Sequence, residues 1–169
     1  ARDFYTHHVD ALVSPIAPMT LILSKLTPYL VLSLVNLAMI LALSATVLRV
    51  PIAGSLPLLI AESLLFILTA LSLGLLISSS VRTQQAAILS SLTGLMMPMM
   101  LFTGFVFPIE NMPMPLQLFA NVVPSRWFYV IVKNVMIKGT GFDAVWRETL
   151  TLATTTLVLL LAGYKKFNL

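Results

Sequence analysis

Glu62 is the residue whose type and setting most invite a chemical role. It lies within a run of apolar residues, and the basic residues nearest to it in sequence are Arg49 and Arg82. If that run crosses a membrane, an acid inside it is costly and by default suggests a functional site, for example a proton-coupled one. The alternative is that Glu62 is protonated or hydrogen-bonded where two helices meet, or that it faces a water-filled cavity. Because no basic partner accompanies it inside the run, the sequence favours this second interpretation.

Four methionines gather around a proline, at Met96, Met97, Met99 and Met100 on either side of Pro98. Methionine side chains are flexible and polarisable, so they adapt to irregular apolar surroundings. They could line a path for apolar molecules, or they could fill the gaps around a kink at the proline. The sequence favours packing but leaves both interpretations open.

Metal and nucleotide chemistry have little support. His7 and Asp10 share a helix face at i, i+3 spacing, but two ligands do not make a metal site, and His8 points elsewhere. The chain has no cysteine. It also lacks the phosphate loop Gly-x-x-x-x-Gly-Lys-Ser/Thr, the dinucleotide motif Gly-x-Gly-x-x-Gly and the zinc motif His-Glu-x-x-His. We therefore predict that this chain binds no cofactor; if ATP drives the protein, another polypeptide binds it.

The elements that carry these residues are long apolar segments. Hydrophobic residues make up 59% of the chain and charged residues 9%, whereas ordinary globular chains have about 25% charged residues. A helix needs about 20 apolar residues to cross the ~30 Å hydrocarbon core of a bilayer. The sequence therefore predicts an all-α, polytopic membrane protein, surrounded by lipid, with four spans at Leu26–Leu48, Leu56–Ile77, Ala86–Phe107 and Val145–Tyr164.

The segment between the third and fourth spans, residues 108–144, is neither fully polar nor fully apolar. Several prolines interrupt it, among them Pro108 and Pro124. Short helices that dip into the membrane and return fit such a composition, because irregular backbone survives at membrane depth only when protein or water shields it. Arg126 and Trp127 are expected to anchor this re-entrant segment at the interface.

Two further patterns concern packing and charge. Small residues recur at every fourth position in the second span, as Ala70, Gly74 and Ser78, and again at the start of the third. Because small residues let membrane helices approach closely, we expect these two spans to pack together. The net charge of +4 comes from residues scattered at span ends, without the basic stripe that nucleic-acid binding requires. Counting basic residues gives five on each side of the membrane, so charge alone leaves the orientation open.

Several segments resemble ABC-2 type transporter permeases, specifically the carboxy-terminal half of a bacterial exporter of the drug-efflux-like subgroup. The resemblance covers essentially the whole chain, and its motifs occur in the family's order. The residues that carry it are Val13–Ile16, Lys25–Tyr29, Gly74–Ser78 with Arg82–Gln85, Thr103–Pro113, and Val123–Phe128 followed by Ile137–Gly139.

The resemblance implies an inner-membrane subunit with six spans, of which the last four are present here. It would export its substrate as a dimer, identical or paralogous, driven by a separate ATPase that binds ATP and Mg²⁺. Residues 1–25, 78–85 and 165–166 would be cytoplasmic, and residues 108–144 would form a re-entrant extracytoplasmic hairpin. The residues of interest in that hairpin are Pro108, Glu110, Pro124 and Arg126, and the candidate translocation path comprises Glu62, Met96, Met97, Met100 and Phe105.

The resemblance also places the ATPase-coupling helix ahead of the first span. An acid and an apolar side chain, Asp10 and Leu12, would enter a groove of the ATPase, followed by Val13, Ser14 and Pro15. The sequence departs from the family here, because the glycine of the usual Glu-x-Gly-Thr-x-Glu-x-Leu pattern is missing.

Two other functions compete with transport. An intramembrane enzyme would need at least two convergent polar groups within the spans, and only Glu62 stands well inside one. A structural scaffold would have no need of the proline-marked segment 108–144. The substrate stays open among lipids, drugs, polysaccharide precursors and ions.

Overall fold

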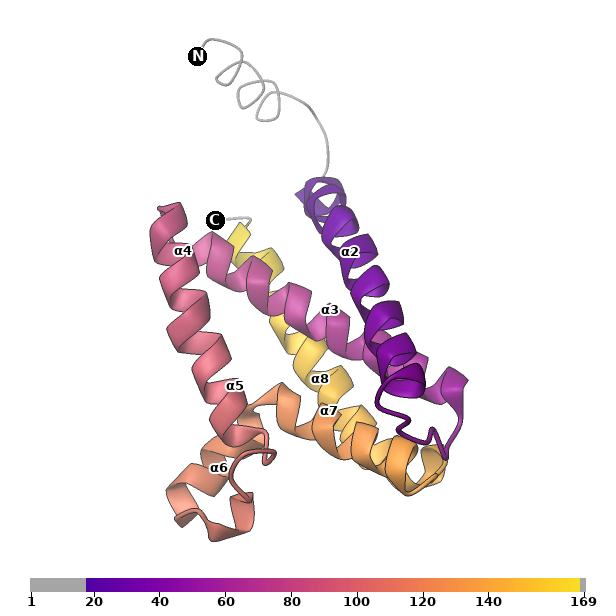
Figure 1. Ribbon diagram of the computed structural model, residues 1–169. Helices are drawn as coiled ribbons and strands as arrows, with labels where there is room; N and C mark the ends of the chain where they lie inside the picture. Colours follow the sequence, from indigo (N-terminus) through magenta and orange to yellow (C-terminus); the bar gives the residue numbers. More distant parts are fainter. Residues whose placement is uncertain (1–17, 168–169) are drawn as a thin grey trace.

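The computed structural model describes residues 18–167, and within that range every regular element is a helix. The all-α prediction is confirmed. The elements, shown in Figure 1, are α2 (Pro18–Thr46), α3 (Leu56–Ser80), α4 (Gln84–Ser91), the π-helix η1 (Leu92–Met96), α5 (Met97–Phe102), the 3₁₀-helix η2 (Ile109–Asn111), α6 (Met114–Val122), α7 (Pro124–Val132), the π-helix η3 (Lys133–Ile137) and α8 (Phe142–Phe167).

Four helical segments are long and apolar enough to cross a membrane, which confirms the polytopic architecture with four candidate spans. The third of them is composite, because α4, η1 and α5 follow one another without a break. These segments are Thr20–Thr46, Leu56–Ser80, Gln84–Phe102 and Phe142–Lys166.

Two prolines shape the helices that contain them. Because α2 begins at Pro18 and not at Leu26, where the predicted first span starts, Pro28 lies in the helix interior and not in its opening turn. The hydroxyls of Ser24 and Thr27 donate to carbonyls one turn earlier, and such bonds help membrane helices to accommodate proline. Pro98 instead follows the π-helix η1, whose wider turn accommodates the missing donor.

The core forms where α3, α7 and α8 meet. Its fully buried members include Leu59 of α3, Ile131 of α7 and Leu152 of α8. Figure 1 shows α7 lying across α3 and α8, while the α4–α5 segment stands apart from them. The protein thus divides into a packed three-helix unit, with α2 along one side, and one span that leans away.

This arrangement contradicts the expected packing of the second span against the third. The two contact each other only near the turn that joins them. Within the described part of the chain, no atom lies within 4 Å of a Cβ built on Gly74 or Gly94. The stripe Ala70, Gly74 and Ser78 instead borders a hollow beside Lys25 and Tyr29 of α2.

The connection between α2 and α3 is fastened to η3. The backbone N–H of Ala53 donates to the carbonyl of Met136, with 3.0 Å between N and O. Gly54 lies so close to Val135 that a Cβ added there would be 2.3 Å from the Val135 carbonyl oxygen. Gly139, with a φ of +66°, fits against Ala53 in the same way. This contact fixes where α3 begins relative to η3.

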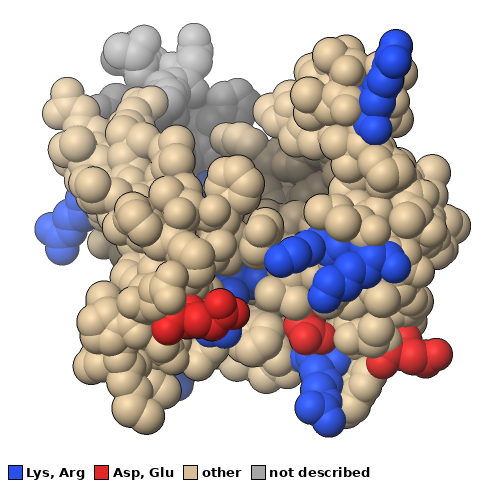
Figure 2. Space-filling model, turned by 60° about the horizontal axis from the view of Figure 1, so that its bottom comes forward, with Lys and Arg blue, Asp and Glu red and all other residues tan. Residues whose placement is uncertain are grey.

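Charged side chains lie at the two ends of the helical bundle. The end that comes forward in Figure 2 carries the α2–α3 connection, α6, η3 and the start of α8, and both signs of charge occur on it. Its charged residues are Arg49, Glu110, Arg126, Lys133, Lys138, Asp143, Arg147 and Glu148, whereas the opposite end carries Lys25, Arg82, Lys165 and Lys166.

Candidate translocation site

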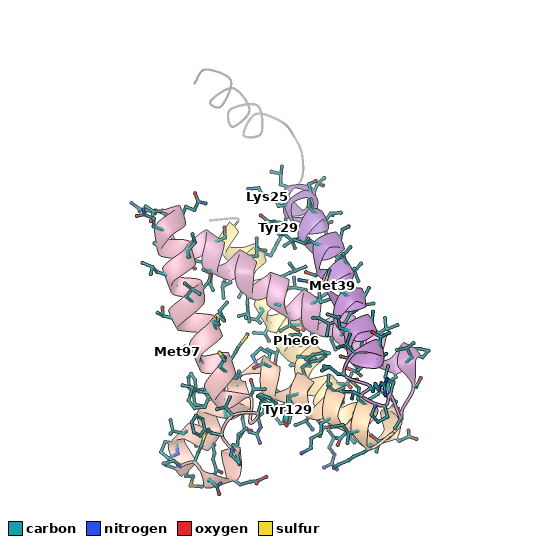
Figure 3. All side chains as sticks on the ribbon, viewed as in Figure 1. Lys25, Tyr29, Met39, Phe66, Met97 and Tyr129 are labelled. Carbon is teal, nitrogen blue, oxygen red and sulfur yellow. The ribbon has the colours of Figure 1, made fainter. Side chains whose placement is uncertain are left out.

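The residues predicted to line a path do not converge on one cavity. Glu62 is 3% exposed on α3. Met96 and Met97 are exposed on the span that leans away from α3 (Met97 in Figure 3). Met100 and Phe105 line a separate cavity of about 330 Å³. The role of these five residues in transport stays a prediction.

Glu62 faces α8, where a polar line joins the two parallel helices. Its Oε1 accepts a hydrogen bond from the Thr149 hydroxyl at 2.6 Å. Seven residues further along both helices, the hydroxyls of Thr69 and Thr156 are 2.5 Å apart. Since seven residues make about two turns, both pairs lie on one line along the contact. We call these four residues the α3–α8 polar seam.

The seam sets the register of two helices that run in the same direction. Its two pairs have the same sequence separation, 87 residues, and a further bond joins Lys166 Nζ to Ser80 Oγ at 2.7 Å near the helix ends. Gly163 lets α8 approach Leu75, whose Cδ2 would lie 3.3 Å from an added Cβ. A slip of α8 by one residue would break every one of these contacts.

Only one of the two carboxylate oxygens of Glu62 has a hydrogen-bond partner among the described residues. Among residues 18–167, Oε2 of Glu62 and Oε2 of Glu148 are buried without a hydrogen-bond partner. Within the same range, no three potential ligands cluster as a metal site would require. The geometry therefore agrees with the interpretation of Glu62 as a hydrogen-bonded residue at a helix contact, with one acceptor left free.

We expect the threonine pair of the seam to be coupled energetically. Replacing Thr69 or Thr156 with valine removes a hydroxyl at constant shape, and hydrogen bonds between membrane helices contribute about 0.6 kcal/mol on average. The double variant should therefore cost less than the sum of the single variants by about that amount. Unfolding the full-length protein by titration with dodecyl sulfate would measure the difference.

Thr154→Val supplies the control for this cycle, because the exposed hydroxyl of Thr154 bonds only to the carbonyl of Leu150 in its own helix. Combined with Thr69→Val, it should behave additively. Strict additivity of Thr69→Val with Thr156→Val would show that the pair is not coupled.

Of the residues predicted to form a hairpin, two lie at the turn between α6 and α7 and two lie near η2, ahead of α6. Pro124 is buried and begins α7, whereas Pro108 and Glu110 are exposed near η2. The guanidinium of Arg126 donates to the side-chain oxygen of Asn121 and lies 5.3 Å from the centre of the Trp127 ring.

The same turn is tied to neighbouring elements. Trp127 Nε1 donates to the Asn121 carbonyl at 2.9 Å, and the hydroxyls of Ser125 and Thr103 are 3.0 Å apart, which links α7 to the end of α5. Arg126 and Trp127 thus brace the turn. Their predicted anchoring at the membrane interface stays a prediction.

Sequence reasoning missed the partners of Glu62. Each threonine hydroxyl of α8 also donates to a carbonyl one turn earlier in the same helix, at Thr149, Thr151, Thr154, Thr155 and Thr156. A usable signal was the repeated spacing of seven residues, from 62 to 69 and from 149 to 156, which places polar groups on matching helix faces. The coupling residues Asp10, Leu12, Val13, Ser14 and Pro15, like His7 and His8, lie outside the described residues.

A comparison with family models decides what these four spans belong to. The model described as "ABC-2 family transporter protein" matches residues 10–165. The chain belongs to this family. No solved structure matches it.

Three relatives in Escherichia coli strain K12 carry the word permease in their names. The probable multidrug ABC transporter permease YbhR is 34% identical over 157 residues, which cover 93% of this chain and 42% of YbhR. The probable multidrug ABC transporter permease YbhS is 33% identical over 140 residues, or 82% of this chain and 37% of YbhS. The inner membrane transport permease YhhJ is 30% identical over 144 residues, covering 83% and 38%. The chain thus spans about two fifths of the length of these relatives.

Family membership confirms the resemblance noted in the sequence. This ABC-2 family chain is a multi-pass membrane protein with four candidate spans. The α3–α8 polar seam therefore lies in the membrane part of an ABC-2 family protein, and the permease-named relatives favour a transport role over an ATPase role.

Proposed function

We propose that this chain forms part of an inner-membrane permease that exports its substrate, driven by a separate ATPase that binds ATP and Mg²⁺. The observation that carries the proposal is the family match over residues 10–165. The absence of a phosphate-binding loop from the 169 residues is consistent with ATP binding by a partner chain. A second permease subunit, identical or paralogous, completes the substrate path.

The proposed extracytoplasmic hairpin has support from the direction of the helices. Because α3 and α8 are parallel, the segment between α5 and α8 begins and ends at the same end of the bundle. Phe128 of α7 stacks on Phe66 at 4.3 Å between ring centres, whereas Met136 meets the connection that precedes α3. Phe66 lies ten residues into α3, about 15 Å along its axis. The segment therefore reaches well into the bundle and returns, with α7 shielded between helices.

The proposed coupling region precedes α2, and α2 is suited to transmit its movement. Asp10, Leu12, Val13, Ser14 and Pro15 would contact the ATPase. Directly after them, α2 runs for 29 residues from Pro18 to Thr46, which is about 43 Å of continuous helix. Tilting of its cytoplasmic end would move its far end as well. ATP can drive such a change only if the ATP-bound and ATP-free partner differ in affinity for the two arrangements.

Co-purification tests this function directly. We expect the full-length permease, expressed with its proposed partner ATPase, to elute as one complex in detergent and to raise the rate of ATP hydrolysis severalfold in lipid nanodiscs. Leu12→Asp should abolish that stimulation, because a charge replaces the apolar group that enters the ATPase groove.

Met114→Ala serves as the control variant, because Met114 is 76% exposed at the other end of the bundle. It should keep the stimulation. An ATPase that neither co-elutes with the permease nor responds to it would refute the proposed function.

A further inference from the structure

A cavity of about 430 Å³ lies between α2, α3 and α7. Small-molecule sites typically occupy about 300–1,000 Å³, so this cavity has room for a compact organic molecule. Two of its walls are built on α3 and on the α7–η3 segment, and the third is one face of α2. None of the predicted path residues lines it.

The α3 and α7–η3 walls are firmly packed and apolar except for Ser63, whose hydroxyl already donates to the Leu59 carbonyl of its own helix. Leu59 is 1% exposed and Met136 is 9% exposed, and both belong to the buried core. On the same two walls, the rings of Phe66 and Phe128 stack in parallel, with an interplanar angle of 4° (Phe66 in Figure 3). These side chains are held by the core, so this part of the cavity exists before any ligand arrives. It offers a flat, apolar surface.

The α2 wall is different, because three polar side chains lie on it: Ser33, Asn36 and Ser44. Elsewhere on α2, hydroxyl groups bond to carbonyls of their own helix, as those of Ser24, Thr27 and Thr46 do. Within residues 18–167, no side-chain hydrogen bond forms at the three positions that face the cavity. The three residues line one space without side-chain hydrogen bonds, Ser33 and Ser44 half-buried and Asn36 exposed.

Depth makes these polar groups significant. Asn36 lies ten residues before the end of α2, about 15 Å along the axis, and therefore near the middle of the span. A polar amide left without a partner in hydrocarbon costs several kcal/mol. Such a side chain is stable there only if it meets water, protein or a polar group of a ligand.

No ionisable side chain lines the cavity. A charged group placed inside it would lose its hydration without gaining a counter-charge, which is strongly unfavourable. The shape and chemistry together define the occupant as an uncharged molecule with a flat apolar body and a hydrogen-bonding edge.

We propose that this cavity binds uncharged amphipathic aromatic molecules, with the apolar body against Phe66 and Phe128 and the polar edge at Asn36. The proposal rests on the permease function and specifies the substrate class for it. It also identifies α2 as the helix that would transmit movement of the coupling region to a bound molecule.

Photolabelling of the full-length permease with its ATPase in nanodiscs tests the proposal. The probe is 3-(trifluoromethyl)diazirinyl-benzyl alcohol, which is uncharged, aromatic and carries one hydroxyl; its analogue without the hydroxyl is the comparison. We expect the alcohol to label peptides from residues 33–44, 59–67 and 128–136, and excess benzyl alcohol to suppress that labelling. Asn36→Leu should lower labelling by the alcohol at least fivefold and leave labelling by the analogue unchanged.

Thr46→Val is the matched control, since Thr46 lies on the same helix but bonds to the Ala42 carbonyl; it should change neither labelling. Equal labelling by both probes, insensitive to Asn36→Leu, would overturn the proposal by showing that lipid fills the cavity. Absence of adducts in these peptides would overturn it by showing that another part of the protein fills it. In either case the ATPase would still co-elute, so failure of this inference is distinguishable from failure of the permease function.

Discussion

Replacing Gly54 with alanine is expected to destabilise the folded permease by about 3 kcal/mol. The added Cβ would lie 2.3 Å from the carbonyl oxygen of Val135, far inside the contact distance of these atoms. Both are fixed to backbone, so no side-chain rotation relieves the clash, and overpacking of this kind typically costs about 1–3 kcal/mol or more. The connection between α2 and α3 would have to move away from η3. The bond from Ala53 to Met136 would be lost with it.

Dodecyl sulfate titration of the full-length protein, followed by the folded fraction, measures this effect. Gly141→Ala is the matched control, because the same change there meets no atom within 4 Å in the described part of the chain. It should alter the free energy of unfolding by no more than about 0.5 kcal/mol. Equal midpoints for the two variants would show that the close approach of Gly54 to Val135 does not form in the membrane.

The spans could be predicted from the sequence because the bilayer imposes one simple requirement, a long apolar helix. Leu56 begins both the predicted second span and α3. Proline was the weaker guide. Pro28 reads as the start of a span, yet α2 passes through it, since hydroxyls and neighbouring helices can satisfy freed backbone groups in a membrane.

Helix partners were harder to predict than helices. The spacing of Ala70, Gly74 and Ser78 indicates that one helix face carries only small side chains, but it does not indicate which helix packs against that face. In the structure the face borders the hollow beside α2, and α3 makes its long contact with α8 instead. Proximity in the sequence favoured packing of α3 against the next span. In the structure α3 packs against α8, and the residues that pair across this contact are 87 positions apart in the sequence.

The candidate site, too, could be predicted from the sequence only in part. Glu62 stood out because an acid within an apolar run is costly, and the structure agrees with its interpretation as a residue at a helix contact. Asn36 was not singled out, because one amide in a span carries no chemical signature on its own. Its significance depends on what it faces, and that depends on how α2, α3 and α7 pack.

Glu62→Lys is expected to abolish folding of the permease in the membrane. Glu62 is 3% exposed, and its Oε1 accepts from Thr149. A lysine there would place a positive charge in the α3–α8 polar seam and would remove the acceptor of the Thr149 hydroxyl. Breaking a buried polar contact in this way costs about 3–5 kcal/mol. The yield of monodisperse protein in detergent should therefore fall at least tenfold.

Glu62→Gln separates the structural role from a chemical one. Glutamine keeps an oxygen that can accept from Thr149, so the folded fraction should stay close to that of the unaltered protein. Glu110→Lys, an equal change of charge at an exposed residue, should fold normally, because an exposed side chain keeps its hydration. If Glu110→Lys lowered the yield as much as Glu62→Lys, the loss would reflect total charge and not the seam. If Glu62→Gln folded and stimulated the ATPase but failed to transport, an exchangeable proton at Glu62 would be part of the transport cycle, because glutamine reproduces the shape and the acceptor but not the acid.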